Sequence, residues 1–140
     1  MPMITVQYAT PDARNIRKAD VVAAVTKLSH GILRKDPKVT AILVQEANAA
    51  DWFCGGVSLA DANKAAFWLD IRITDGTNNK DEKAAFVAAA FKAFGELLGP
   101  LHEESYVHVH DVRGDAYGFG GLTQEHRYVA GKLSALSRAA

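Results

Sequence analysis

Residues 51–56 read DWFCGG, and residues 115–121 read DAYGFGG. Each stretch places aromatic residues before a pair of glycines, a pattern typical of a tight turn. The glycine pairs are 65 residues apart, and the same offset relates many residues before them. The matched residues are Lys18 with Lys83, Val22 with Val87, Ala23-Ala24 with Ala88-Ala89, Lys27 with Lys92, Leu33 with Leu98, and Val44 with Val109. The chain is therefore predicted to contain two copies of one unit.

Each copy carries the same succession of hydrophobic periods. A strand with one buried face is predicted where Ile4, Val6 and Tyr8 alternate with polar residues, and again near residue 70. Apolar residues at three- and four-residue steps then predict a helix, and a second strand follows it. The expected helices cover 14–33 and 79–98, and the expected second strands cover 40–47 and 105–112.

Strand, helix, strand is a βαβ unit, in which the two strands lie parallel. Two such units predict an α+β fold, a four-stranded sheet with both helices on one face. The other face is then bare, which favours oligomerisation through it. We expect a single domain over 1–140, made of repeat one (2–56), a linker (57–66), repeat two (67–121) and a tail (122–140) that forms a short helix and reaches over a neighbour.

Composition and charge limit the classes of binding partner that are expected for this chain. Sixteen basic residues balance sixteen acidic ones, so neither nucleic acid nor an anionic membrane is expected. No apolar run is long enough to span a bilayer, and the first residues do not have the pattern of a signal peptide. Cys54 is the only cysteine and has no internal disulfide partner, which fits a cytoplasmic location.

Two βαβ units, a chain that begins Met1-Pro2 and an aromatic-glycine turn in each half together resemble the tautomerase superfamily. Its 4-oxalocrotonate tautomerase-like members are single units, and longer members fuse two. The resemblance covers residues 2–128. It implies a fold like that of macrophage migration inhibitory factor (MIF), in a homotrimer whose sheets line a central barrel with the helices outside. It also implies a small-molecule substrate and no cofactor.

Pro2 is the expected catalytic residue. Once Met1 is removed, Pro2 is a secondary amine at the chain terminus. An α-amino group titrates at about 7.7–8.0, and an apolar pocket with cationic neighbours lowers that pKa toward neutrality. Such an amine can take a proton from the carbon beside a carbonyl and return it elsewhere. The alternative is that Pro2 merely starts a strand, and a retained Met1 would make the protein a trimeric binding protein without catalysis.

Further candidates lie on the sheet face away from the predicted helices, where side-chain alternation places Arg72, Tyr106 and His108. Arg72 is expected to bind a substrate carboxylate or polarise its carbonyl, or else to pair with Asp70. Tyr106 and His108 are expected to donate hydrogen bonds to the developing enolate, or to pack in a subunit interface.

Three residues are candidates for substrate binding. Trp52 is expected to form an apolar wall beside Pro2, or to be a core or trimer contact, and Tyr117 belongs to the matching turn of the second half. His30 resembles a histidine of the cis-3-chloroacrylic acid dehalogenase branch. The alternative for His30 is that it favours the helix carboxyl terminus, where its charge interacts with the helix dipole.

No metal site is expected. His108 and His110 share a strand face, but no third ligand accompanies them at an informative spacing. Cys54 has no basic residue beside it in the sequence and is expected to pack.

The arginines of the known branches are absent from the corresponding segments, and Arg14, Arg17 and Arg127 are misplaced. The expected activity is therefore keto–enol tautomerisation of a small keto monoacid or neutral enol rather than of a dicarboxylate. A dehalogenase, hydratase or decarboxylase reaction with the same proline remains the enzymatic alternative.

Overall fold

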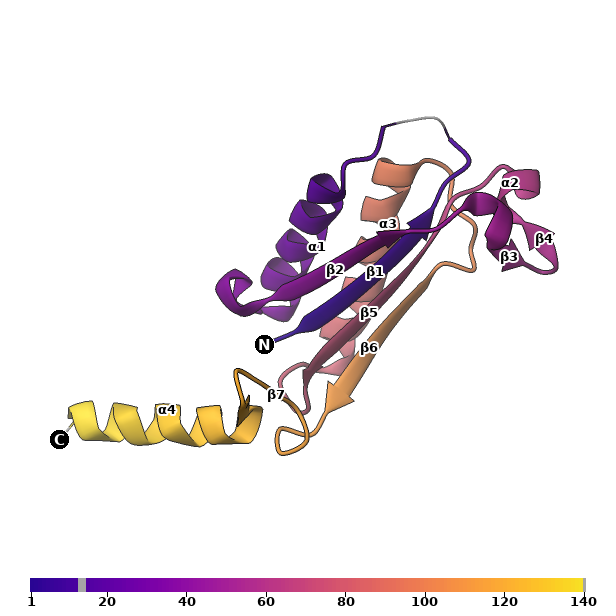
Figure 1. The fold of residues 1–140 in the computed structure, drawn as a ribbon. Helices are drawn as coiled ribbons and strands as arrows, with labels where there is room; N and C mark the ends of the chain where they lie inside the picture. Colours follow the sequence, from indigo (N-terminus) through magenta and orange to yellow (C-terminus); the bar gives the residue numbers. More distant parts are fainter. Residues whose placement is uncertain (13–14, 140) are drawn as a thin grey trace.

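A computed structural model describes residues 1–12 and 15–139, and its centre is a four-stranded sheet in the order β2–β1–β5–β6. The strands are β1 (Met3–Ala9), β2 (Ala41–Glu46), β5 (Ala66–Thr74) and β6 (Tyr106–Val112). β1 is parallel to β2 and β5 to β6, whereas β1 and β5 are antiparallel. Helices α1 (Lys18–Leu33) and α3 (Lys80–Leu98) both cover one face (Figure 1). The predicted double βαβ architecture is therefore confirmed.

The core lies between this face and the two helices. The alternation read from the sequence is observed, because Ile4, Val6 and Tyr8 are fully buried while their neighbours in β1 point to the other face. Phe67 of β5 stacks on Phe94 of α3 with ring centroids 4.1 Å apart. Burial of apolar side chains such as these is the main contribution to the stability of the domain.

The two helices begin differently. Asn79 caps α3 through a capping box with Glu82, so this helix starts within one residue of the prediction. α1 begins only at Lys18, after Arg17, which provides no side-chain cap. The predicted start at 14 is wrong for the described part of that stretch, because Ile16 still packs on the core but outside the helix. Arg14 itself lies outside the described residues.

Both predicted turns are hairpins. The first joins β3 (Phe53–Cys54) to β4 (Val57–Ser58), and the second joins β7 (Gly118–Phe119) to β8 (Leu122–Thr123). Each glycine pair lies at the tip with positive φ, 58° and 80° in the first hairpin and 61° and 82° in the second, where a side chain would be strained. The expected linker 57–66 thus contains the second strand of a hairpin, followed by the short helix α2 (Leu59–Ala62).

Short 3-10 turns, η1 (Pro37–Val39) and η2 (Ala49–Asp51), flank β2, and the chain ends in α4 (Gln124–Ala139). Figure 1 shows α4 projecting away from the sheet and its two covering helices. Its apolar side chains Tyr128, Leu133 and Leu136 are exposed. The tail is therefore helical, as predicted. No helix in the described part of the chain is long and apolar enough to cross a membrane.

The sheet face opposite α1 and α3, called here the bare face, carries no covering element in Figure 1. It presents exposed apolar side chains, among them Leu43, Trp68 and Tyr106, with polar residues between them. An exposed apolar surface of this kind is typical of a subunit interface.

Candidate functional site

The antiparallel pairing of β1 with β5 determines which hairpin lies beside Pro2. β2 and β6 each end where the first strand of the other repeat begins. The β7–β8 hairpin of repeat two therefore lies at the amino terminus of the chain, and the β3–β4 hairpin of repeat one lies at the start of β5.

Pro2 lines a cavity of about 470 Å³. Pro2 is buried, and its carbonyl accepts a hydrogen bond from the Ala41 amide at 3.1 Å, which continues the pairing of β1 with β2. The cavity is lined by Met1, Pro2, Met3, Lys38, Val39, Thr40, Ala41, Tyr117, Gly118 and Phe119. Gly118 is required in this wall, because a Cβ atom there would lie 2.2 Å from the carbonyl oxygen of Leu122.

Tyr117 places its hydroxyl at the bond between Met1 and Pro2. Its hydroxyl donates a hydrogen bond to the Met1 carbonyl and lies 3.1 Å from the carbonyl of Arg72. Burial raises the pKa of Tyr117, although a backbone hydrogen bond with Met3 and the positive charge of Arg72 oppose that effect. The phenol therefore stays protonated at neutral pH and is available as a hydrogen-bond donor.

Two lysines that the sequence analysis missed lie near the amino terminus. Burial and the charge of Lys35 lower the pKa of the Met1 amine, and Asp36 partly offsets them. Lys35 is itself buried and donates to the Thr77 hydroxyl at 2.9 Å. Lys38 lines the cavity. The position of these lysines could have been predicted from the strand pairing. β1 and β2 are parallel and begin at the same edge of the sheet, with Met3 opposite Ala41. Cations just before the second strand must then lie beside Pro2.

Arg72 lies close to this cavity, on the bare face. It is opposite Met3 in the register, and its Nε is 3.7 Å from the Asp70 carboxylate. Arg72 and Tyr117 also line a second hollow of about 590 Å³ on that face. Of the two roles expected for Arg72, the structure shows the pairing with Asp70, and the binding of a substrate carboxylate stays a prediction.

Tyr106 and His108 do not lie beside Pro2 of the same chain. Both are on the bare face, as predicted, but on β6, two strands from β1. His108 is level with Asp70 and Thr5, and Tyr106 is level with Trp68 and Gln7. Within one chain they are therefore separated from the cavity both across the sheet and along it.

Trp52 and His30 do not line the Pro2 cavity. Trp52 precedes the β3–β4 hairpin and packs on the cluster of Ala9, Leu59 and Ala66 at the opposite end of β1. Tyr117, its equivalent at the offset of 65, occupies the place beside Pro2. His30 is in the last turn of α1, where Nδ1 lies 3.2 Å from the Lys35 carbonyl oxygen.

In the structure a third potential ligand, Asp70, lies beside His108 and His110. Their rings are 3.7 Å apart, and His110 Nε2 lies 2.8 Å from Asp70 Oδ2. Asp70 belongs to the neighbouring strand, so inspection of spacing along one strand could not find it.

Comparisons with solved structures identify the fold. A fused 4-OT wild-type asymmetric trimer matches with a TM-score of 0.72 at 19% identity, over 88% of this chain and 98% of that one. A structure of Pt0534 inactivated by 2-oxo-3-pentynoate matches with a TM-score of 0.74 at 13% identity, over 89% and 98%. Macrophage migration inhibitory factor from Oncomelania hupensis matches with a TM-score of 0.68 at 18% identity, over 86% and 95%. No model of a protein family and no curated protein sequence matches the chain.

Proposed function

We propose that this chain, which has the tautomerase fold in its fused two-repeat form, is a cofactor-independent keto–enol tautomerase with Pro2 as its general base. The observation that carries the proposal is the cavity at Pro2, where the Tyr117 hydroxyl lies at the bond that joins Met1 to Pro2. Removal of Met1 would leave a secondary amine facing a protonated phenol.

The proposed reaction needs one base and one hydrogen-bond donor. Pro2 nitrogen takes a proton from the carbon beside the substrate carbonyl, and the electron pair of that C–H bond moves toward the carbonyl oxygen. Tyr117 donates a hydrogen bond to the oxygen as it becomes negative. The same proton is then returned at another atom of the enolate, so substrate and product are isomers.

The positive charges favour an acidic substrate. Lys35 lies close enough to lower the pKa of the terminal amine, Lys38 lines the cavity, and Arg72 borders it next to Tyr117. A small keto acid would place its carboxylate near Lys38 or Arg72 and its enolisable carbon near Pro2. A homotrimer formed through the bare face would add groups of a neighbouring subunit, and this is how Tyr106 and His108 would contribute.

Labelling with 2-oxo-3-pentynoate tests the base directly. We expect one equivalent to attach to Pro2 of the mature protein and to abolish tautomerisation of phenylenolpyruvate, because a neutral amine adds to the alkyne conjugated with the ketone. Intact mass and peptide mapping give the stoichiometry and the position.

A matched sample that retains Met1 should neither react at Pro2 nor turn over substrate. Attachment to Lys38 or Cys54 with Pro2 unmodified would contradict the proposal. Retention of Met1 in protein isolated from its native host would also contradict it, because Pro2 would then be an amide.

The Lys35→Gln variant is expected to shift the pH profile. In the native chain the charge of Lys35 lowers the pKa of the Met1 amine. The same charge should lower the pKa of a Pro2 amine at this place, so its loss in the variant should raise that pKa. A base acts only when unprotonated, and kcat/KM therefore rises with pH through that pKa. The acid limb should move to higher pH in the variant, and glutamine can still donate to Thr77. Lys64→Gln, at the other end of the sheet, should leave the profile unchanged, and an unshifted limb for Lys35→Gln would exclude this role of Lys35.

A further inference from the structure

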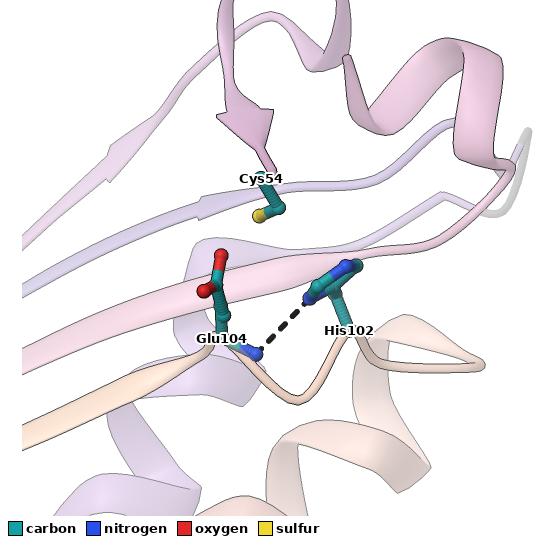
Figure 2. Close-up of side chains that lie close together, drawn as sticks. All are labelled: Cys54, His102 and Glu104. Carbon is teal, nitrogen blue, oxygen red and sulfur yellow. Dashed lines mark hydrogen bonds between the residues drawn. The ribbon is translucent and has the colours of Figure 1, made fainter. Parts of the chain in front are cut away.

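The internal repeat creates a second place like the Pro2 cavity, at the start of β5. Three side chains meet there, Cys54 of the first hairpin and His102 and Glu104 before β6 (Figure 2), and we call them the Cys54 cluster. The offset of 65 makes Cys54 equivalent to Phe119 and Glu104 equivalent to Val39, and both of these residues line the Pro2 cavity. The second place has no chain terminus, since β5 continues from the preceding segment, and it carries ligating side chains instead.

The geometry of the Cys54 cluster suits a cation. The thiol, one imidazole nitrogen and one carboxylate oxygen all lie within 4.8 Å of one another. The Glu104 amide donates a hydrogen bond to His102 Nδ1 at 3.1 Å, so that nitrogen carries a lone pair and no proton (Figure 2). A cation would replace this amide as the partner of the lone pair. Cys54 is buried and Glu104 is exposed, which leaves an entry from solvent on the side of the carboxylate.

The metal-free cluster keeps its thiol in the protonated form. Burial raises the pKa of the Cys54 thiol, and the neighbouring Glu104 carboxylate raises it further by charge and by a hydrogen bond. The thiol is therefore a poor nucleophile in the metal-free chain. A divalent cation held between the two groups would reverse this effect, since a metal-bound thiol loses its proton.

We propose that the Cys54 cluster binds a divalent cation of the zinc type through Cys54, His102 and Glu104. Sulfur, imidazole nitrogen and carboxylate oxygen together are the ligand set of Zn²⁺ rather than of Mg²⁺ or Ca²⁺. Three protein ligands leave a fourth position for water or for a ligand of a partner molecule. Bond lengths of about 2.0–2.3 Å require the ligand atoms to approach to roughly 3.3–3.8 Å. Ligand atoms as far apart as 4.8 Å must therefore close by about 1–1.5 Å, and His102 must exchange the Glu104 amide for the ion.

The second group of potential ligands, Asp70, His108 and His110, is less suited to a cation. The Arg72 guanidinium lies 3.7 Å from the Asp70 carboxylate and would repel the ion, and no sulfur is present. The Cys54 site is also independent of the chemistry proposed for Pro2, because the two places lie at opposite ends of β1.

Cobalt titration of the full chain tests the site. The protein is treated with EDTA, freed of the chelator and titrated with Co²⁺ alone. We expect one Co²⁺ per chain, a near-ultraviolet absorption from charge transfer between thiolate and cobalt, and loss of that absorption when Zn²⁺ displaces the ion. Absence of the absorption would overturn the proposal.

Variants locate the ion. Cys54→Ser should abolish the charge-transfer absorption, and His102→Ala and Glu104→Gln should each weaken binding at least about tenfold. Glu104 is exposed, so Glu104→Gln reports on binding without an effect on folding. Glu103→Gln, which alters the adjacent acid, is the matched control and should bind as the parent chain does. Unchanged affinity in Glu104→Gln, or loss of binding in His110→Ala with retention in Cys54→Ser, would overturn the assignment.

Discussion

Insertion of one glutamine between Met1 and Pro2 is expected to reduce kcat/KM for phenylenolpyruvate by at least about 100-fold, the contribution typical of a positioned general base. Methionine before a large residue is retained, so the proline nitrogen becomes an amide and loses its basicity. The fold accommodates this change, because Pro2 of the present structure already carries Met1, whose carbonyl is bonded to Tyr117. The variant therefore removes the base and retains the proline ring.

Two controls separate chemistry from folding. Thermal unfolding and oligomeric state should match the parent chain, since the inserted residue lies before β1. Pro2→Ala should lose less activity than the insertion, because removal of Met1 would leave a primary amine in nearly the same place. Full activity of the insertion variant would show that Pro2 nitrogen is not the base.

The fold could be predicted from the sequence because its signals are redundant. A strand period, a helix period and a glycine pair occur twice at one offset, so an error in one copy is corrected by the other. The start of α1 could not be predicted in the same way. Arg17 gives no capping bond, whereas Asn79 and Glu82 form a capping box that determines the start of α3.

The pattern within a single strand predicts which face of the sheet a site residue occupies, and that part of the site could be predicted. Alternation placed Arg72, Tyr106 and His108 on the correct face, but it gave no position along or across the sheet. The antiparallel docking of the two repeats decides that Tyr117 and not Trp52 lies beside Pro2. It also brings His102 to Cys54, which no spacing in the sequence indicates. Lys35 and Lys38 were within reach of prediction, because parallel strands begin at the same edge.

A charged substitution on the bare face is expected to have a large effect on self-association. Trp68→Asp is expected to weaken self-association at least about 100-fold and to convert the oligomer to monomer, because a carboxylate buried in an apolar interface without a partner costs several kcal/mol. Trp68 is 46% exposed in the single chain and lies between Gln7 and Tyr106 on this face. Sedimentation velocity over a range of protein concentrations measures the change.

Val87→Asp is the matched control for that variant. Val87 is 40% exposed but lies on α3, on the helical side of the sheet, so its charge should leave assembly intact. An oligomer that survives Trp68→Asp would mean that the bare face is not the interface.

The activity of the monomeric Trp68→Asp variant tests whether Tyr106 and His108 act within one chain or across the interface. Because they lie two strands from Pro2 within one chain, we expect any contribution of theirs to its cavity to come from a neighbouring subunit. Their replacement should therefore lower the turnover of the assembled protein and leave that of the monomer unaltered.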